Sequence, residues 1–190
     1  VTSNAAREFE SLGCHVVESD LKLEPPYDTF GPIMTANFCA TYANYMDTHR
    51  DQLTEYVKFF IEHGKDVTAI EYARTLGLVE TLKSQMTDLF EEYDLLLSPT
   101  ACFPAFQYGK FPGEIKGVSA YPEQYWNGTF TLPINVVGHP AATVPAGFSS
   151  GGLPIGLHII GRKGDEETVI AASAAFESAH PWTQCRPPMS

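Results

Sequence analysis

The sequence contains few basic side chains and no long apolar run. Its 190 residues include 12 Lys and Arg against 23 Asp and Glu, which gives a formal net charge of -11 at pH 7. Proteins that bind the phosphate backbone of nucleic acids need clustered basic residues, so we expect no nucleic-acid partner. A transmembrane helix needs about 18 apolar residues in a row, and no such run is present, so we expect no membrane partner either.

Cysteine is scarce as well, and no two cysteines have the Cys-x-x-Cys spacing. The four are Cys14, Cys39, Cys102 and Cys185. This usage, with no apolar leader at the N-terminus, favours a cytoplasmic protein whose thiols are buried, and it leaves two disulfides or a metal site as alternatives. The six histidines show no metal-ligand spacing, and no glycine-rich phosphate loop occurs, so we expect no metal and no cofactor.

What is present predicts a folded domain of helices and strands. Apolar residues make up 44% of the chain, enough to bury a core. Apolar periodicity predicts helices near residues 5–12, 30–45, 52–63, 68–93, 128–137 and 165–176. Strands are expected at residues 14–17, 94–100, 142–148 and 155–160. Because the two kinds of element alternate, we expect an α/β fold with a mixed sheet covered by helices.

Two details of these elements can be tested directly. Thr68 and Glu71 have the spacing of a capping box, which opens the fourth helix, and Gly77 is expected to break or bend that helix. The strand at residues 14–17 has a helix but no strand before it, whereas a parallel sheet needs an earlier strand. Together with the absence of an initial Met, this indicates that Val1 is not the natural start of the chain.

One local motif suggests a nucleophilic serine. Residues 147–151 match G-x-S-x-G around Ser149, and Asp165 and His180 follow in the order of an α/β-hydrolase triad. However, a nucleophile elbow leads from a strand into a helix, whereas here Gly and Pro lead into a second strand, which favours a hairpin turn. An α/β-hydrolase that uses Ser149, His180 and Asp165 stays open as an alternative.

Four sequence blocks, taken together, resemble the C-terminal part of amidase-signature hydrolases. They are Asp66–Ala73, Tyr93–Thr100, Asn135–Gly147 and Gly152–Gly161. Their order and spacing are similar to that family along nearly the whole chain. The resemblance implies that residues 1–190 are the C-terminal part of a single amidase-signature domain, from which the N-terminal catalytic half is absent.

The resemblance also implies a reaction and a set of partners. Family members hydrolyse amides to a carboxylate and ammonia or an amine with a Ser-cisSer-Lys triad, in which a buried, neutral Lys is the base. The Gly/Ser-rich segment that carries this triad is missing here, so no catalytic residue can be assigned in this chain. The expected partners are the missing N-terminal half of the enzyme, a small-molecule amide and, in a homodimer, a second copy.

Site residues are expected in the segment before the block at residues 135–147, which approaches the substrate in the family. The candidates are Trp126, Asn127, Thr129 and Phe130, an aromatic wall with polar tips; the alternative is that they pack the core or a lid. Gly128 stands where the A subunits of glutamyl-tRNA amidotransferases typically carry an Asp that holds the ammonium of glutamine. This difference favours a general amidase. The alternatives are an amidotransferase A subunit or a non-catalytic interaction module.

Overall fold

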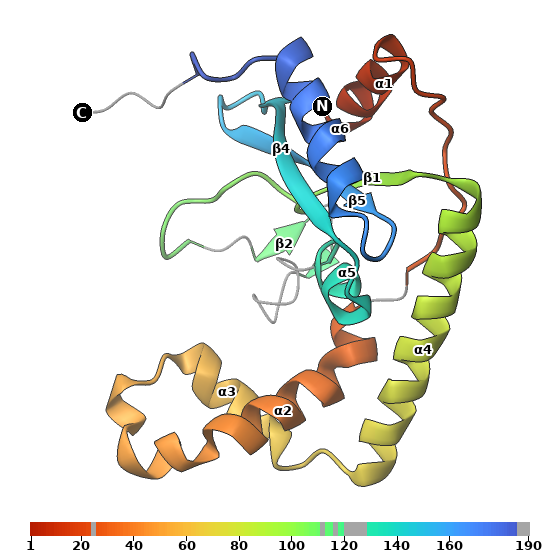
Figure 1. Ribbon diagram of the computed structural model, residues 1–190. Helices are drawn as coiled ribbons and strands as arrows, with labels where there is room; N and C mark the ends of the chain where they lie inside the picture. The colour runs from red at the N-terminus through yellow and green to blue at the C-terminus, as the bar shows by residue number, and fades with distance from the viewer. Residues whose placement is uncertain (24–25, 111–112, 116–117, 120–128, 186–190) are drawn as a thin grey trace. The chain divides into compact units, whose positions relative to one another are not determined.

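The computed structural model describes residues 1–23, 26–110, 113–115, 118–119 and 129–185. The chain forms two compact units, residues Val1–Lys22 with Thr87–Ser190 and residues Leu23–Met86 (Figure 1). The first unit holds the sheet, and the second is helical. The α/β class expected from the sequence is confirmed.

The sheet of the first unit has three strands in the order β1-β5-β4, which are Leu95–Pro99, Pro154–Gly161 and Ala141–Phe148. Both pairings are antiparallel, and β4 and β5 form the predicted hairpin. A separate antiparallel pair joins β2 (Glu114–Ile115) to β3 (Val118–Ser119). No parallel pairing, which a mixed sheet would contain, occurs among the residues that the structure describes.

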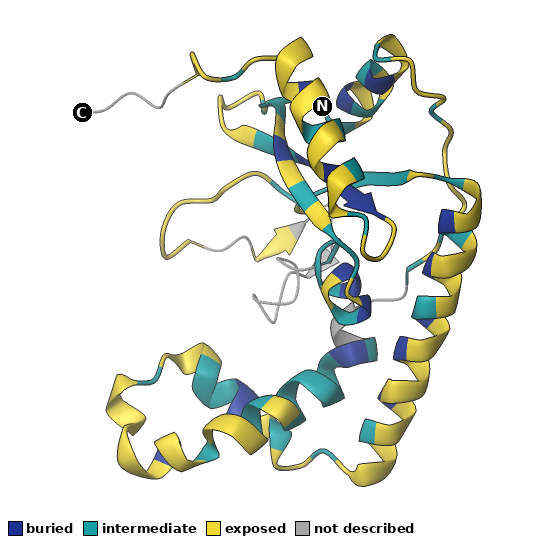
Figure 2. Ribbon diagram, in the orientation of Figure 1, coloured by how far each residue is buried: buried dark blue, intermediate teal, exposed yellow. Residues whose placement is uncertain are grey.

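One face of the three-stranded sheet carries the core of this unit. Alternation along β4 and β5 places Val144, Leu157 and Ile159 on the same face. Two helices pack against it, α1 (Thr2–Ser11) and α6 (Glu166–Ala179). Their aromatic rings meet, because Phe9 of α1 stacks on Phe176 of α6 with ring centroids 5.4 Å apart. Figure 2 shows buried positions on both the strands and the helices.

The predicted strand at residues 14–17 is wrong. The chain leaves α1 through Gly13 at a φ of 89°, and the backbone N–H of Cys14 returns a hydrogen bond to the carbonyl of Phe9. The segment then runs without strand structure, and within it only Val16 packs against the core, while Val17 is 43% exposed. This absent strand is the one that was expected to pair with an earlier, parallel strand.

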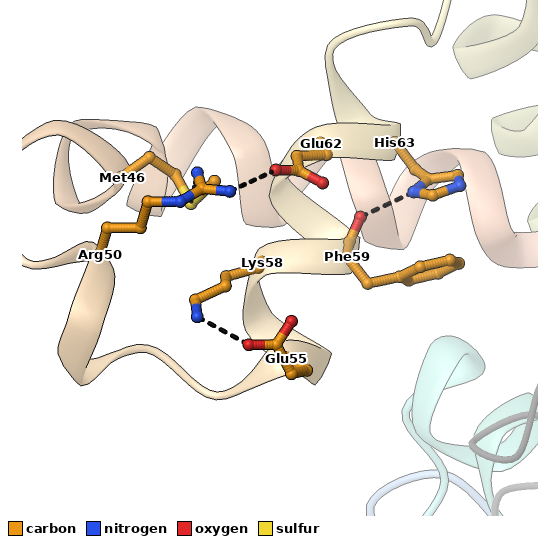
Figure 3. A network of polar contacts seen from close by, with 7 residues as sticks. All are labelled: Met46, Arg50, Glu55, Lys58, Phe59, Glu62 and His63. Carbon is orange, nitrogen blue, oxygen red and sulfur yellow. Dashed lines mark hydrogen bonds and ion pairs between the residues drawn. The ribbon is translucent and has the colours of Figure 1, made fainter.

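The second unit contains a helical hairpin and residues 69–86 of the fourth helix. The hairpin consists of α2 (Pro26–Thr48), the short 3-10 helix η1 (Arg50–Gln52) and α3 (Glu55–Gly64). Rings from both helices pack together, with Phe38 of α2 5.1 Å from Phe60 of α3 between centroids. At the connection, Arg50 bonds Glu62 at 3.2 Å and Lys58 bonds Glu55 at 2.7 Å (Figure 3).

The fourth helix, α4 (Ala69–Glu92), confirms its predicted cap and contradicts its predicted break. The Thr68 hydroxyl accepts from the Glu71 N–H at 3.2 Å, and the Glu71 carboxylate accepts from the Thr68 N–H at 2.8 Å. This hydrogen bond from the backbone lowers the pKa of Glu71. The helix runs uninterrupted through Gly77, because buried residues on both sides, Thr75 and Val79, keep its inner face packed.

All four cysteines are free, so the two disulfides that the sequence left open as an alternative are not formed. The expectation that they are buried is wrong for Cys14 and Cys185, which are exposed, whereas Cys39 and Cys102 are half-buried.

No helix in the described ranges combines the length and the apolar character that a membrane span requires.

Replacement of Gly161 by Ala should destabilise the protein. A Cβ at this position would lie 2.5 Å from Val169 Cγ2 and 3.3 Å from the carbonyl oxygen of Asp165, which is overpacking. The expected loss is about 1–3 kcal/mol in the free energy of unfolding, measured by urea denaturation. The matched control is Gly77→Ala, where a Cβ meets nothing within 4 Å and should add about 0.5–1 kcal/mol in a helix. An unchanged or higher stability of Gly161→Ala would contradict this packing.

Candidate functional site

The short helix α5 (Leu132–Val137) follows the candidate site residues directly. It begins four residues later than predicted, and its side chains at Pro133, Ile134 and Val137 are buried. Of the candidate site residues, Thr129 and Phe130 precede this helix in a turn, and both are half-buried. Trp126 and Asn127 lie outside the described residues.

Backbone hydrogen bonds join α5 to the residues on both sides. At the start, the Asn135 N–H donates to the carbonyl of Thr131 at 3.0 Å. At the end, Gly138 adopts the left-handed conformation, with a φ of 75°, in which glycine carries no steric cost. The N–H groups of Gly138 and His139 both donate to the carbonyl of Ile134, at 2.9 and 3.4 Å. The segment from Thr131 to His139 is therefore continuously hydrogen-bonded.

His139 is the centre of a contact that we call the junction. Its Nδ1 lies 2.9 Å from the carbonyl oxygen of Gly161, and its ring stacks on Phe90 with centroids 5.0 Å apart. Because a carbonyl oxygen only accepts, Nδ1 carries the proton. The Gly161 N–H donates to the carbonyl of Pro140 at 2.9 Å, and Arg162 donates twice to the carbonyl of Phe90, at 2.6 and 3.2 Å. The junction joins the end of α4, the start of β4 and the end of β5.

A row of polar side chains lies on the sheet face opposite the core. Ser98, His158 and Thr143 are directly opposite one another across β1, β5 and β4. The Ser98 hydroxyl lies 3.4 Å from His158 Nδ1, and Thr100 donates to the Thr143 hydroxyl at 3.3 Å. The two threonines approach across Gly156, where a Cβ would lie only 2.6 Å from Thr100 Oγ1.

This serine and histidine do not form a nucleophile–base pair. The Ser98 hydroxyl donates to the carbonyl of Pro99 at 3.1 Å, so its single proton is directed away from the imidazole. His158 is 5% exposed, and burial lowers the pKa of its imidazole. The histidine is therefore a neutral interior residue of the sheet.

The candidate triad of Ser149, His180 and Asp165 is not assembled, because each side chain has its own local partner. The Ser149 hydroxyl accepts from the Leu153 N–H at 3.1 Å and closes the β4–β5 turn. The Asp165 carboxylate caps α6 by accepting from the Thr168 N–H at 3.2 Å.

His180 lies just after α6 and pairs instead with α1. Its Nε2 is 3.4 Å from the carboxylate of Glu8. The hairpin interpretation of residues 147–154 is therefore confirmed, and the nucleophile elbow is wrong.

Metal binding finds no support either. Among the residues that the structure describes, no group of three His, Cys, Asp or Glu side chains could hold a metal ion.

The junction was not predicted from the sequence, although His139 between Gly138 and Pro140 is a local signal of a turn. Neither was the contact between Ser98 and His158, which depends on strand register.

Comparison with known proteins shows which family and which proteins this chain is similar to. The model of the family described as Amidase matches residues 1–170. An acylamidase from Rhodococcus erythropolis is 30% identical over 193 residues, which cover 98% of this chain and 40% of that relative. The A subunit of the glutamyl-tRNA(Gln) amidotransferase from Granulibacter bethesdensis is 46% identical over 112 residues, which cover 59% of this chain and 21% of the relative.

A solved structure gives the same result for the fold. A bacterial aryl acylamidase of the amidase signature family superposes with a TM-score of 0.82 at 31% identity, covering 98% of this chain and 42% of that one. The chain thus spans about two fifths of the length of the two acylamidases that it matches.

The pH dependence of stability should report the burial of His158. Because burial lowers its pKa in the folded state, the unfolded state binds the proton first as the pH falls below about 6.5. Stability should therefore fall between pH 8 and pH 5 more steeply in the wild type than in His158→Gln, as measured by urea denaturation. Other titrating groups cancel in this difference. Parallel pH profiles for the two proteins would show that His158 is not buried as a neutral ring.

Proposed function

Because the chain belongs to the amidase family, we propose that it is the C-terminal part of an enzyme that hydrolyses carboxylic amides to a carboxylate and ammonia or an amine. The observation that carries the proposal is the match over 98% of the chain to a solved aryl acylamidase. In this proposal, residues 1–190 are one part of a single amidase-signature domain. The rest of that domain is the principal partner of the chain.

The contribution of this chain is a wall of the substrate pocket. Thr129 and Phe130 lie in the turn before α5, a helix that is itself held by its buried face and by the junction at its far end. An aromatic wall with a few polar tips suits the binding of a small amide. We include Trp126 and Asn127 in this wall on their sequence position alone.

The reacting groups, in this proposal, come from outside residues 1–190. Acyl transfer needs a serine hydroxyl free to attack and a base that can take its proton. The hydroxyls of Ser98 and Ser149 are already engaged by backbone groups. Lys58 and Lys83 each form an ion pair with a glutamate three residues earlier, so both ammonium groups already have a partner within this chain.

The sequence of events follows from the triad that the family resemblance implies. The serine oxygen attacks the amide carbonyl, and backbone N–H groups stabilise the oxyanion. The amine leaves with the proton that the lysine received, and water then releases the carboxylate from the acylated serine. The pocket wall holds the acyl part of the substrate in place through both steps.

A glutamine-dependent amidotransferase A subunit is the second candidate. It is favoured by the 46% identity over 112 residues to the Granulibacter bethesdensis protein. Against it stands Gly128, which offers no charge to the ammonium of glutamine. The two candidates differ in the polarity of the substrate that the pocket accepts.

Substrate preference in the complete enzyme separates these candidates. We expect kcat/KM for an aryl amide such as an anilide to exceed that for glutamine by about 100-fold or more, because a charged substrate without its counter-ion is strongly disfavoured. The variant Gly128→Asp should narrow that ratio by improving kcat/KM for glutamine, with Gly128→Asn as the uncharged control. A wild-type preference for glutamine would favour the amidotransferase. Loss of both the anilide and the glutamine activity in the Gly128 variants would contradict the proposed pocket.

A further inference from the structure

The position of α5 cannot be set by its own hydrogen bonds. It has six residues, and a helix of that length is marginal in water without tertiary contacts. Its place therefore depends on its buried face and on whatever fixes its ends. At the end towards β4, the side chain of His139 reaches β5 through the junction.

The surfaces that His139 contacts are themselves fixed. Gly161 is held by its hydrogen bond to Pro140 and by close packing that excludes a Cβ. Phe90 is held through its carbonyl by two hydrogen bonds from Arg162. A displacement of the His139 ring would therefore be taken up by α5 and not by the strand.

We propose that His139 is a positioning residue for the substrate pocket. Its Nδ1–H donor sets the separation of α5 from β5. Its ring, stacked on Phe90, sets the rotation of the residues between α5 and β4. Through the continuous hydrogen bonds of residues 131–139, this contact fixes the start of α5, which the half-buried Thr129 and Phe130 precede in the chain. The inference rests on the proposed function, since it assigns His139 to the pocket wall proposed above.

Two substitutions separate the donor from the ring. Asn carries an N–H donor close to the position of Nδ1 but no ring, so His139→Asn keeps the hydrogen bond to Gly161. His139→Phe keeps the stacked ring and removes the donor. Because a positioning contact acts on substrate binding and not on bond cleavage, the informative quantity is the division of the effect between KM and kcat.

In the complete enzyme, His139→Phe should raise KM for an anilide by about 10-fold, with kcat within about twofold of the wild type, as for the loss of one hydrogen bond. His139→Asn should return KM to within about threefold of the wild-type value, as expected when the hydrogen bond is kept. A role in folding alone would reduce the active fraction, which lowers kcat and leaves KM unchanged. That pattern, or equal KM values for the two variants, would overturn the proposal.

A second measurement does not depend on catalysis. Amide hydrogen exchange should be faster in His139→Phe than in His139→Asn over residues 132–138, and unchanged over residues 157–160. Equal exchange in the two variants would overturn the positioning role, as would faster exchange over both segments, which indicates global loss of structure. If the wild type hydrolyses no amide, the proposed function fails, and the exchange comparison still decides the role of His139.

Discussion

The register of β5 between β1 and β4 is the constraint on which the sheet unit depends. It directs Leu157 and Ile159 to the face covered by α1 and α6, and it directs His158 to the opposite face. A slip of one residue would exchange these faces and bury the polar row in the apolar core. The close approaches at Gly156 and Gly161 also hold only in this register, because each glycine meets a specific neighbour across the sheet or from α6.

The same register determines where residues 129–139 lie against the sheet. The end of β5 carries the carbonyl that His139 contacts and the arginine that binds the end of α4. The junction thus connects a rigid sheet to a short helix that could not hold its own position. A loop supported by a rigid scaffold is the usual arrangement of a binding site. In the proposed function, this geometry lets the chain shape an amide pocket while the reacting groups come from outside residues 1–190.

Local patterns were sufficient to predict much of the fold. The β4–β5 hairpin and the capping box at Thr68 were confirmed, because both depend on neighbouring residues in the sequence. The strand at residues 14–17 was wrong, since this segment pairs with no described strand and only Val16 packs against the core. The break at Gly77 was wrong, since α4 continues through this position between the buried residues Thr75 and Val79. The contact of His158 with Ser98 spans 60 residues, so no local pattern could have revealed it. Of the candidate site, a helix next to the block at residues 135–147 was predicted, but its expected start at residue 128 was wrong and would have placed Thr129 and Phe130 inside the helix. The support of α5 by the junction was not predicted.

In the proposed function, this chain forms sheet and pocket wall, while the attacking serine lies outside residues 1–190. A fluorophosphonate forms a covalent bond with the activated serine of a serine hydrolase and leaves hydrogen-bonded structural hydroxyls unmodified. The most direct test is to label the complete enzyme with such a probe and to map the adduct by peptide mass spectrometry. We expect a single adduct, on a serine outside residues 1–190. An adduct on Ser149, Ser98 or any other serine of this chain would contradict it.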